Sequence, residues 1–222
     1  GEPFAFRGFM ERILPGLIER TPHTVSCLTN LSAPLSILRR FAELTRGRLG
    51  IVSASLHLEF VQPEEFLEKA RALRGWIDPS ARMVVNSVMV PGRLPALAGA
   101  RREVEAAGLR FFPQWMKVGP GKVEYAEGEQ LHVEELLGES PGPERANLSP
   151  SYRGRLCWTG VDYFVVLQNG DVWSCRTARR HGEGFLGNVL EGTVRRRNAP
   201  LACPYDICPC TVPANRGMIE GL

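Results

Sequence analysis

Cysteines are the residues of this sequence whose types and spacing most directly suggest chemistry. Five of the six lie in the last third of the chain. Two of these five flank a predicted β-hairpin whose turn contains Asn169-Gly170, so their thiols are expected at its open end. Four soft thiolates meeting at one point suit an iron–sulfur cluster or a zinc ion. The candidate metal ligands are Cys157, Cys175, Cys203, Cys208 and Cys210.

Other roles for these cysteines fit the spacing less well. Zinc sites usually combine two close C-x2–4-C pairs, and Cys157 with Cys175 is not such a pair. Buried structural cysteines have no reason to cluster near one terminus, and disulfide scaffolds are small and loop-rich. We therefore favour reduced thiols that bind a cluster, keep zinc as the alternative, and expect Cys27 to be an inert buried thiol.

The first 118 residues alternate helical and strand-like patterns, which predicts an α/β fold with a parallel sheet. The segment 119–150 is rich in turn residues and predicts a connector, and residues 151–222 predict a small cysteine-rich module with a hairpin. Strands are expected at 23–30, 50–57, 81–90 and 109–117, with helices near 9–18, from Pro34 to about Gly47, from Pro63 onward, and over 93–107.

The cysteine-rich module resembles the SPASM/twitch auxiliary-cluster domain of radical S-adenosylmethionine (SAM) enzymes. That domain opens with a cysteine, a hairpin, a glycine, four residues and a second cysteine, which here are Cys157, Gly170 and Cys175. The segments FLGNVLEG and CPYDICPC resemble its closing part. The full SPASM module has more cysteines than this chain, so the twitch form with one auxiliary 4Fe-4S cluster is the closer match.

The N-terminal part is then similar to the radical SAM core, a partial (β/α)6 barrel, here lacking its first strands. Gly1-Glu2-Pro3 resembles the end of the GGEP motif, which in the family contacts the methionine amino group of the cofactor. Polar residues at later strand ends would face the same cofactor. The resemblance implies SAM-binding residues Gly1, Glu2, Pro3, Asn30, Ser55, His57 and Asn86.

The family's CxxxCxxC motif, which binds the catalytic 4Fe-4S cluster, is missing from the sequence. We expect it upstream of Gly1 in an intact parent and expect this fragment to be inactive alone. The parent would use a SAM-derived radical on a peptide, protein or natural product, with flavodoxin or ferredoxin as electron donor. The alternatives are a zinc-stabilised interaction module without enzymatic activity and a degenerate, radical SAM-like peptide-binding protein. No catalytic residue is identified.

Composition excludes some partners. The formal net charge is only +3, which argues against nucleic acid or a membrane surface as a partner. No window approaches the roughly 18 apolar residues of a membrane span, and the first residues do not resemble a signal peptide, so we expect a cytoplasmic protein. The arginine groups Arg195–Arg197 and Arg176, Arg179 and Arg180 are expected on a solvated face.

Overall fold

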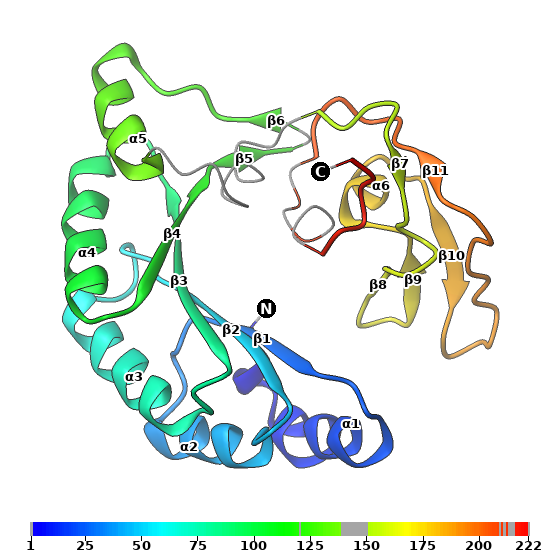
Figure 1. Ribbon diagram of the computed structural model, residues 1–222, viewed down its shortest axis with the longest axis horizontal. Helices are drawn as coiled ribbons and strands as arrows, with labels where there is room; N and C mark the ends of the chain where they lie inside the picture. The colour runs from blue at the N-terminus through cyan, green and yellow to red at the C-terminus, as the bar shows by residue number, and fades with distance from the viewer. Residues whose placement is uncertain are drawn as a thin grey trace. The chain divides into compact units, whose positions relative to one another are not determined.

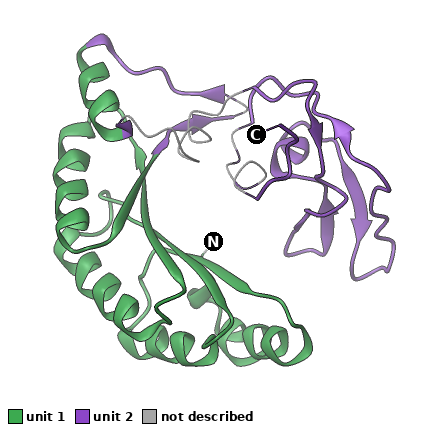
Figure 2. Ribbon diagram, in the orientation of Figure 1, with its two compact units in different colours: residues 1–113, 128–136 green, residues 114–127, 137–222 purple. Residues whose placement is uncertain are grey.

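The computed structural model describes residues 2–119, 121–138, 151–208, 210, 212 and 216–221. The chain divides into two compact units (Figure 2). Unit 1 comprises residues 1–113 and 128–136, and unit 2 comprises residues 114–127 and 137–222. The segment 119–150, expected as a connector, is therefore shared between the units where it is described.

Unit 1 is a mixed α/β structure around a four-stranded sheet in the order β1-β2-β3-β4. The strands are β1 (Val25–Thr29), β2 (Leu49–Ser55), β3 (Arg82–Met89) and β4 (Arg110–Trp115). β2 pairs in parallel with β1 and with β3. The parallel sheet predicted from the sequence is confirmed, and its strand order follows the chain order.

Three crossover helices, α2 (Leu35–Leu44), α3 (Pro63–Trp76) and α4 (Leu94–Ala106), lie along one face of this sheet (Figure 1). They cover a core of fully buried apolar side chains, which includes Phe41 and Phe66. The apolar stripes read from the sequence are the faces that these helices bury, and the expected helix starts at Pro34 and Pro63 are confirmed.

The expected first helix is divided in the structure. A short 3-10 turn, η1 (Pro3–Ala5), leads to a π-helical turn, η2 (Phe9–Ile13), which continues as α1 (Leu14–Arg20). Pro15 is the second residue of α1, and because the residues before it are already helical, its missing amide donor leaves one helical hydrogen bond unmade. The wide π turn thus absorbs the interruption that Pro15 predicted.

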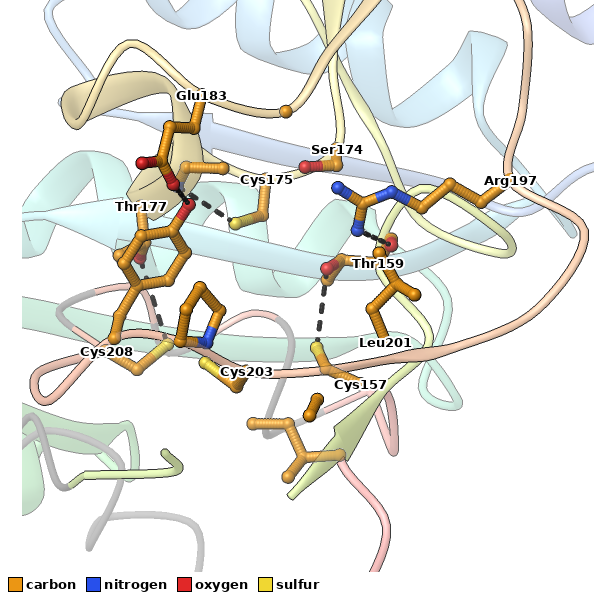
Figure 3. Close-up of a pocket in the computed structure, with 16 residues that line it drawn as sticks. Cys157, Thr159, Ser174, Cys175, Thr177, Glu183, Arg197, Leu201, Cys203 and Cys208 are labelled. Atoms are coloured by element: carbon orange, nitrogen blue, oxygen red, sulfur yellow. Dashed lines mark hydrogen bonds between the residues drawn. The ribbon is translucent and has the colours of Figure 1, made fainter. Parts of the chain in front are cut away.

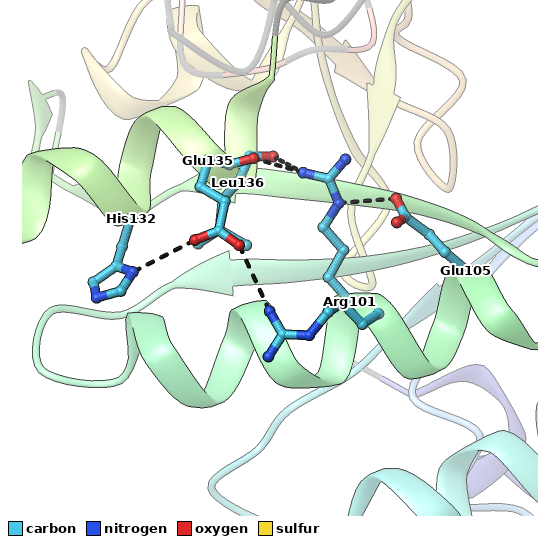
Figure 4. A network of polar contacts seen from close by, with 6 residues as sticks. Arg101, Glu105, His132, Glu135 and Leu136 are labelled. Atoms are coloured by element: carbon cyan, nitrogen blue, oxygen red, sulfur yellow. Dashed lines mark hydrogen bonds and ion pairs between the residues drawn. The ribbon is translucent and has the colours of Figure 1, made fainter.

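A short helix from the connector, α5 (Gln130–Leu137), follows the 3-10 turn η3 (Glu127–Glu129) and is tied to α4 (Figure 4). Arg101 donates to the carbonyl oxygens of Glu135 and Leu136, at 2.8 and 2.9 Å, and pairs with Glu105 at 2.8 Å. Because the last carbonyls of a helix have no partner within it, the guanidinium caps α5 from outside.

Unit 2 contains the predicted hairpin and less regular structure around it. β9 (Asp171–Trp173) pairs antiparallel with β8 (Val165–Val166) and with β10 (Phe185–Asn188). The hairpin turn holds Gly170 at φ +87, which confirms the predicted turn glycine. The remaining elements are the helix α6 (Arg176–Arg180) and the strand pairs β5 (Lys117–Val118) with β6 (Gly121–Lys122) and β7 (Leu156–Cys157) with β11 (Leu201–Ala202).

Cys157 precedes the hairpin, as expected, and lies on β7, which pairs with β11. The chain turns at Gly160, at φ +88, before it enters β8. A residue with a side chain disfavours that backbone conformation, so the glycine permits the turn that lies between β7 and β8.

None of the helices in the described part of the chain combines the length and the apolar character of a membrane span.

Candidate metal centre

Four cysteine thiols from separate segments of unit 2 line one cavity of about 140 Å³ (Figure 3). Cys157 ends β7, and Cys175 is the N-cap residue of α6. Cys203 follows β11, and Cys208 comes five residues later. All six cysteines of the chain are free thiols, and Cys157, Cys175 and Cys208 are buried. The structure thus brings together four of the five predicted metal ligands.

Each of these four sulfurs has a hydrogen-bond donor beside it. The Ala178 amide donates to Cys175 Sγ at 3.2 Å, because the N-terminal amides of α6 have no partner within the helix. Thr159 Oγ1 lies 3.4 Å from Cys157 Sγ, and Thr177 Oγ1 lies 4.0 Å from Cys208 Sγ. The Ala178 amide favours the thiolate form of Cys175, and each threonine hydroxyl can donate to a metal-bound sulfur beside it.

Amide donors also reach Cys203 and Cys208. The amide two residues further along the chain serves each sulfur, at Tyr205 and at Cys210 respectively. Cys208 also donates to the Cys210 carbonyl oxygen at 3.5 Å. The local turns after these two cysteines therefore supply part of the polar environment that a thiolate requires.

Burial acts on the same thiols in the opposite direction. It raises the pKa of Cys208 to about 11, although the Cys210 amide and the Thr177 hydroxyl partly offset this. Burial also raises the pKa of Cys175, against the amides of Ala178 and Thr177, and that of Cys203. The cavity therefore disfavours negative charge on these sulfurs until a cation neutralises it.

The fifth cysteine of the group, Cys210, is not among the residues that line the cavity. It lies near Tyr163. Burial is the main cause that raises the pKa of the Tyr163 phenol. The charge of Cys210 and a hydrogen bond between Cys210 and the phenol raise this pKa further. The sequence left open which four cysteines form the site; Cys210 neighbours Cys208 and Cys175 but is the one of the five that does not line this cavity.

Three of these cysteines also belong to a small apolar cluster. Tyr152, Ile219, Cys157 and Cys208 are buried together, and Cys203 packs against them. Among the described residues, no three Cys, His, Asp or Glu side chains are grouped closely enough to hold a metal ion. The sulfurs therefore share a cavity without the close spacing of a single-ion site.

Several polar residues of the cavity were not predicted from the sequence. Thr159, Thr177, Ser174 and Glu183 line it with Arg197, which was expected on a solvated face. Figure 3 shows the Arg197 guanidinium reaching between Ser174 and Thr159. No local pattern marks these residues, because the hairpin and the later loop carry them to the cavity from different parts of the chain.

A second group of predicted residues lies at the carboxyl end of β1. The Glu2 carboxylate accepts hydrogen bonds from the Thr29 hydroxyl at 2.9 Å and from the Asn30 amide at 2.7 Å. Pro3 starts the 3-10 turn that follows, and the buried Leu31 has a φ of 57, which is unusual for a residue with a side chain. Glu2 is thus anchored to the sheet edge.

The predicted polar residues of β2 and β3 are connected to each other. Ser55 donates to the Asn86 side-chain oxygen at 3.1 Å, and the Asn86 amide group donates to Ser53 at 2.7 Å. Ser55 and Asn86 are also partners in the strand register. His57 lies just beyond β2, with its ring 6.5 Å from that of Phe60. The Asn30 side chain accepts from the Ser32 amide at 2.9 Å.

Two further predictions concern Gly1 and Cys27. Gly1 lies outside the described residues. Cys27 is 6% exposed on β1, and burial, with a smaller contribution from Glu2, raises its pKa to about 12. A thiol with that pKa is almost fully protonated at neutral pH and reacts poorly.

Comparisons with known proteins identify no relative: no family model matches this chain, and no curated protein or solved structure matches it significantly.

Proposed function

We propose that unit 2 holds an auxiliary 4Fe-4S cluster through Cys157, Cys175, Cys203 and Cys208, and that the chain is part of a radical SAM enzyme. The observation that carries the proposal is the convergence of these four thiols on one cavity of about 140 Å³. A cavity of about 150 Å³ in another protein accommodates benzene, so a compact body of several atoms fits this volume.

The spacing of the thiols favours a cluster over a zinc ion. Around one zinc, with Zn–S bonds of about 2.3 Å, tetrahedral geometry places the sulfurs only about 3.8 Å apart. The described residues contain no such close group, although four thiols line the same cavity. A cluster separates its ligands further, because each thiolate binds a different iron.

Complete ligation by cysteine also bears on the role of such a cluster. With a thiolate on every iron, no coordination position is left for substrate, so the chemistry that the group supplies is electron transfer. The chain's own residues bind it, donate hydrogen bonds to its ligands and exclude water. Cys210 is the cysteine that the proposal leaves without a metal-binding role.

The radical SAM part of the proposal is supported by unit 1. Its strand order follows the chain order and its crossover helices lie on one face, which is the winding of a barrel rather than of a doubly wound sheet. Glu2, Asn30, Ser55 and Asn86 gather at or near the carboxyl ends of β1, β2 and β3, where barrel enzymes bind their ligands. We propose a partial radical SAM barrel with these residues, Gly1, Pro3 and His57 at the SAM site.

The proposed role of Glu2 follows from its position. Two hydrogen bonds at the end of β1 fix its carboxylate, which remains an acceptor for an ammonium group such as that of methionine. The sequence has no CxxxCxxC motif, so we expect the chain alone to bind SAM without cleaving it. The proposed substrate of the parent is a peptide, protein or natural product, and its proposed electron donor is flavodoxin or ferredoxin.

Anaerobic loading with iron and sulfide tests the cluster. The expected product is brown, with broad visible absorption and about four irons per chain. Cys203→Ala and Cys208→Ala are expected to lower the iron retained after desalting, whereas Cys210→Ala and Cys27→Ala retain it. A colourless protein that takes up one zinc per chain would instead support the zinc-stabilised interaction module.

Equilibrium dialysis with labelled SAM tests the proposal that the chain is part of a radical SAM enzyme. The loaded chain is expected to bind SAM, and Glu2→Gln is expected to weaken binding by about tenfold, as for one lost charge-assisted contact. Thr45→Ser is a suitable control, since Thr45 is the buried C-cap residue of α2 and its hydroxyl donates to the Phe41 carbonyl oxygen. Absence of SAM binding to the loaded chain would refute the radical SAM assignment and leave the cluster proposal standing.

A further inference from the structure

Arg197 differs from the two arginines that precede it. Arg195 and Arg196 are exposed, whereas Arg197 is half-buried and lines the cavity of the four thiols. Its side chain extends between Ser174 and Thr159 (Figure 3). Three consecutive arginines therefore include one whose guanidinium lies beside the proposed cluster.

The position of Arg197 is fixed by its backbone and by its side chain. Its amide donates to the Gly160 carbonyl oxygen at 2.9 Å, and its Nη1 donates to the Thr159 carbonyl oxygen at 3.3 Å. A Cβ atom on Gly160 would lie 2.9 Å from Arg197 Cδ, so the glycine makes room for the side chain. The guanidinium is thus held in place from one side.

The charge of Arg197 has no carboxylate partner within the described part of the chain. Glu183 also lines the cavity, but it accepts a hydrogen bond of 2.8 Å from the Tyr205 hydroxyl. Arg153, in contrast, pairs with Asp206 at an exposed position. A half-buried guanidinium without a carboxylate beside it is suited to an anionic neighbour.

We propose that Arg197 is a positioning residue that raises the reduction potential of the cluster, an inference that rests on the proposed function. A 4Fe-4S core with four thiolates is an anion, and reduction adds another negative charge. A cation fixed beside it stabilises the reduced form more than the oxidised form, because the Coulomb attraction grows with that charge. The potential therefore shifts to more positive values.

Anaerobic spectroelectrochemistry of the loaded wild type and three variants tests this inference. Arg197→Gln is expected to shift the midpoint potential to more negative values, and Arg197→Lys is expected to restore most of the difference. Arg196→Gln removes the same charge from an exposed position and is expected to leave the potential unchanged, since water and salt screen it. Circular dichroism and iron content confirm that each variant is folded and loaded.

Each result has a defined meaning. An unchanged potential in loaded Arg197→Gln would overturn the inference. If Arg197→Gln does not load but Arg197→Lys does, the requirement for positive charge supports it; failure of both would show that packing on Gly160 is what matters and would overturn it. If the wild type binds no iron and sulfide, the proposed function itself fails, which is distinguishable from all of these outcomes.

Discussion

Replacing Cys157 with alanine should reduce the stability that the proposed cluster would confer on unit 2 by about 3 kcal/mol. A cluster joined to four thiolates acts as a cross-link, and Cys157 closes the loop that ends at Cys175, eighteen residues further on. The chain-entropy relation for a loop of about 18 residues gives about 3 kcal/mol. Cys208 closes a loop of only about five residues, for which the same relation gives about 2 kcal/mol.

The measurement compares loaded and metal-free forms of each variant by anaerobic unfolding in guanidinium chloride, followed by circular dichroism and visible absorption. The metal-free form is needed because Cys157 is 8% exposed and packs with Tyr152 and Ile219, so its truncation also costs packing. For a unit of this size, a loss of about 3 kcal/mol lowers the unfolding midpoint by about 1 M. Cys210→Ala is the matched control, with no expected difference.

Two results would refute this reasoning. Equal losses in Cys157→Ala and Cys210→Ala would mean that the cavity does not select the ligands. A loss for Cys157→Ala that is the same with and without metal would mean that the thiol contributes by packing alone.

Three other predictions concern single contacts. Arg101→Met should destabilise unit 1 by about 1–3 kcal/mol in thermal unfolding, with α5 amides exchanging faster, because two carbonyl oxygens lose a charged donor. Alkylation of native Cys27 at pH 8, followed by mass spectrometry, should be at least about a thousandfold slower than that of a free thiol, because burial raises its pKa to about 12. Gly187→Ala should destabilise unit 2 by more than about 2 kcal/mol in chemical unfolding, because its φ is +117 and a Cβ would lie 2.5 Å from the Thr193 carbonyl oxygen.

Neighbouring positions supply the controls. Arg102→Met removes only an exposed pair with Glu135 and should cost less than about 1 kcal/mol; a cost equal to that of Arg101→Met would contradict the capping role. Alkylation of Cys27 at the rate of an unfolded thiol would show that β1 does not shield it. Gly192 has a φ of +66 with open space around it, so Gly192→Ala should cost about 1 kcal/mol, and the steric argument fails if Gly187→Ala costs no more.

The first unit could be predicted from the sequence because its signals are local. The apolar run of β3 and the stripe of α2 lie within single segments, and Gly108 ends α4 at a φ of +72. The π turn before Pro15 could not be predicted in the same way, since a proline indicates an interruption without specifying how the backbone adjusts.

The candidate site was predictable in part. The thiols could be grouped by number and spacing, but the position of Cys157 depends on the pairing of β7 with β11, more than forty residues later. The choice between Cys208 and Cys210 depends on which sulfur faces the cavity. Arg197 was missed because only its contacts with Thr159 and Gly160 separate it from the exposed arginines beside it.

The small apolar cluster of unit 2, with Tyr152 and Ile219 beside three cysteines, has a consequence for the protein in a cell. All three of these cysteines are residues that we propose as iron ligands, so oxygen damage to the proposed cluster would loosen this packing at the same time. Proteases in the cell cleave chains that unfold, even transiently. The turnover of the protein is therefore expected to follow iron supply and oxygen exposure, with unit 2 cleaved first.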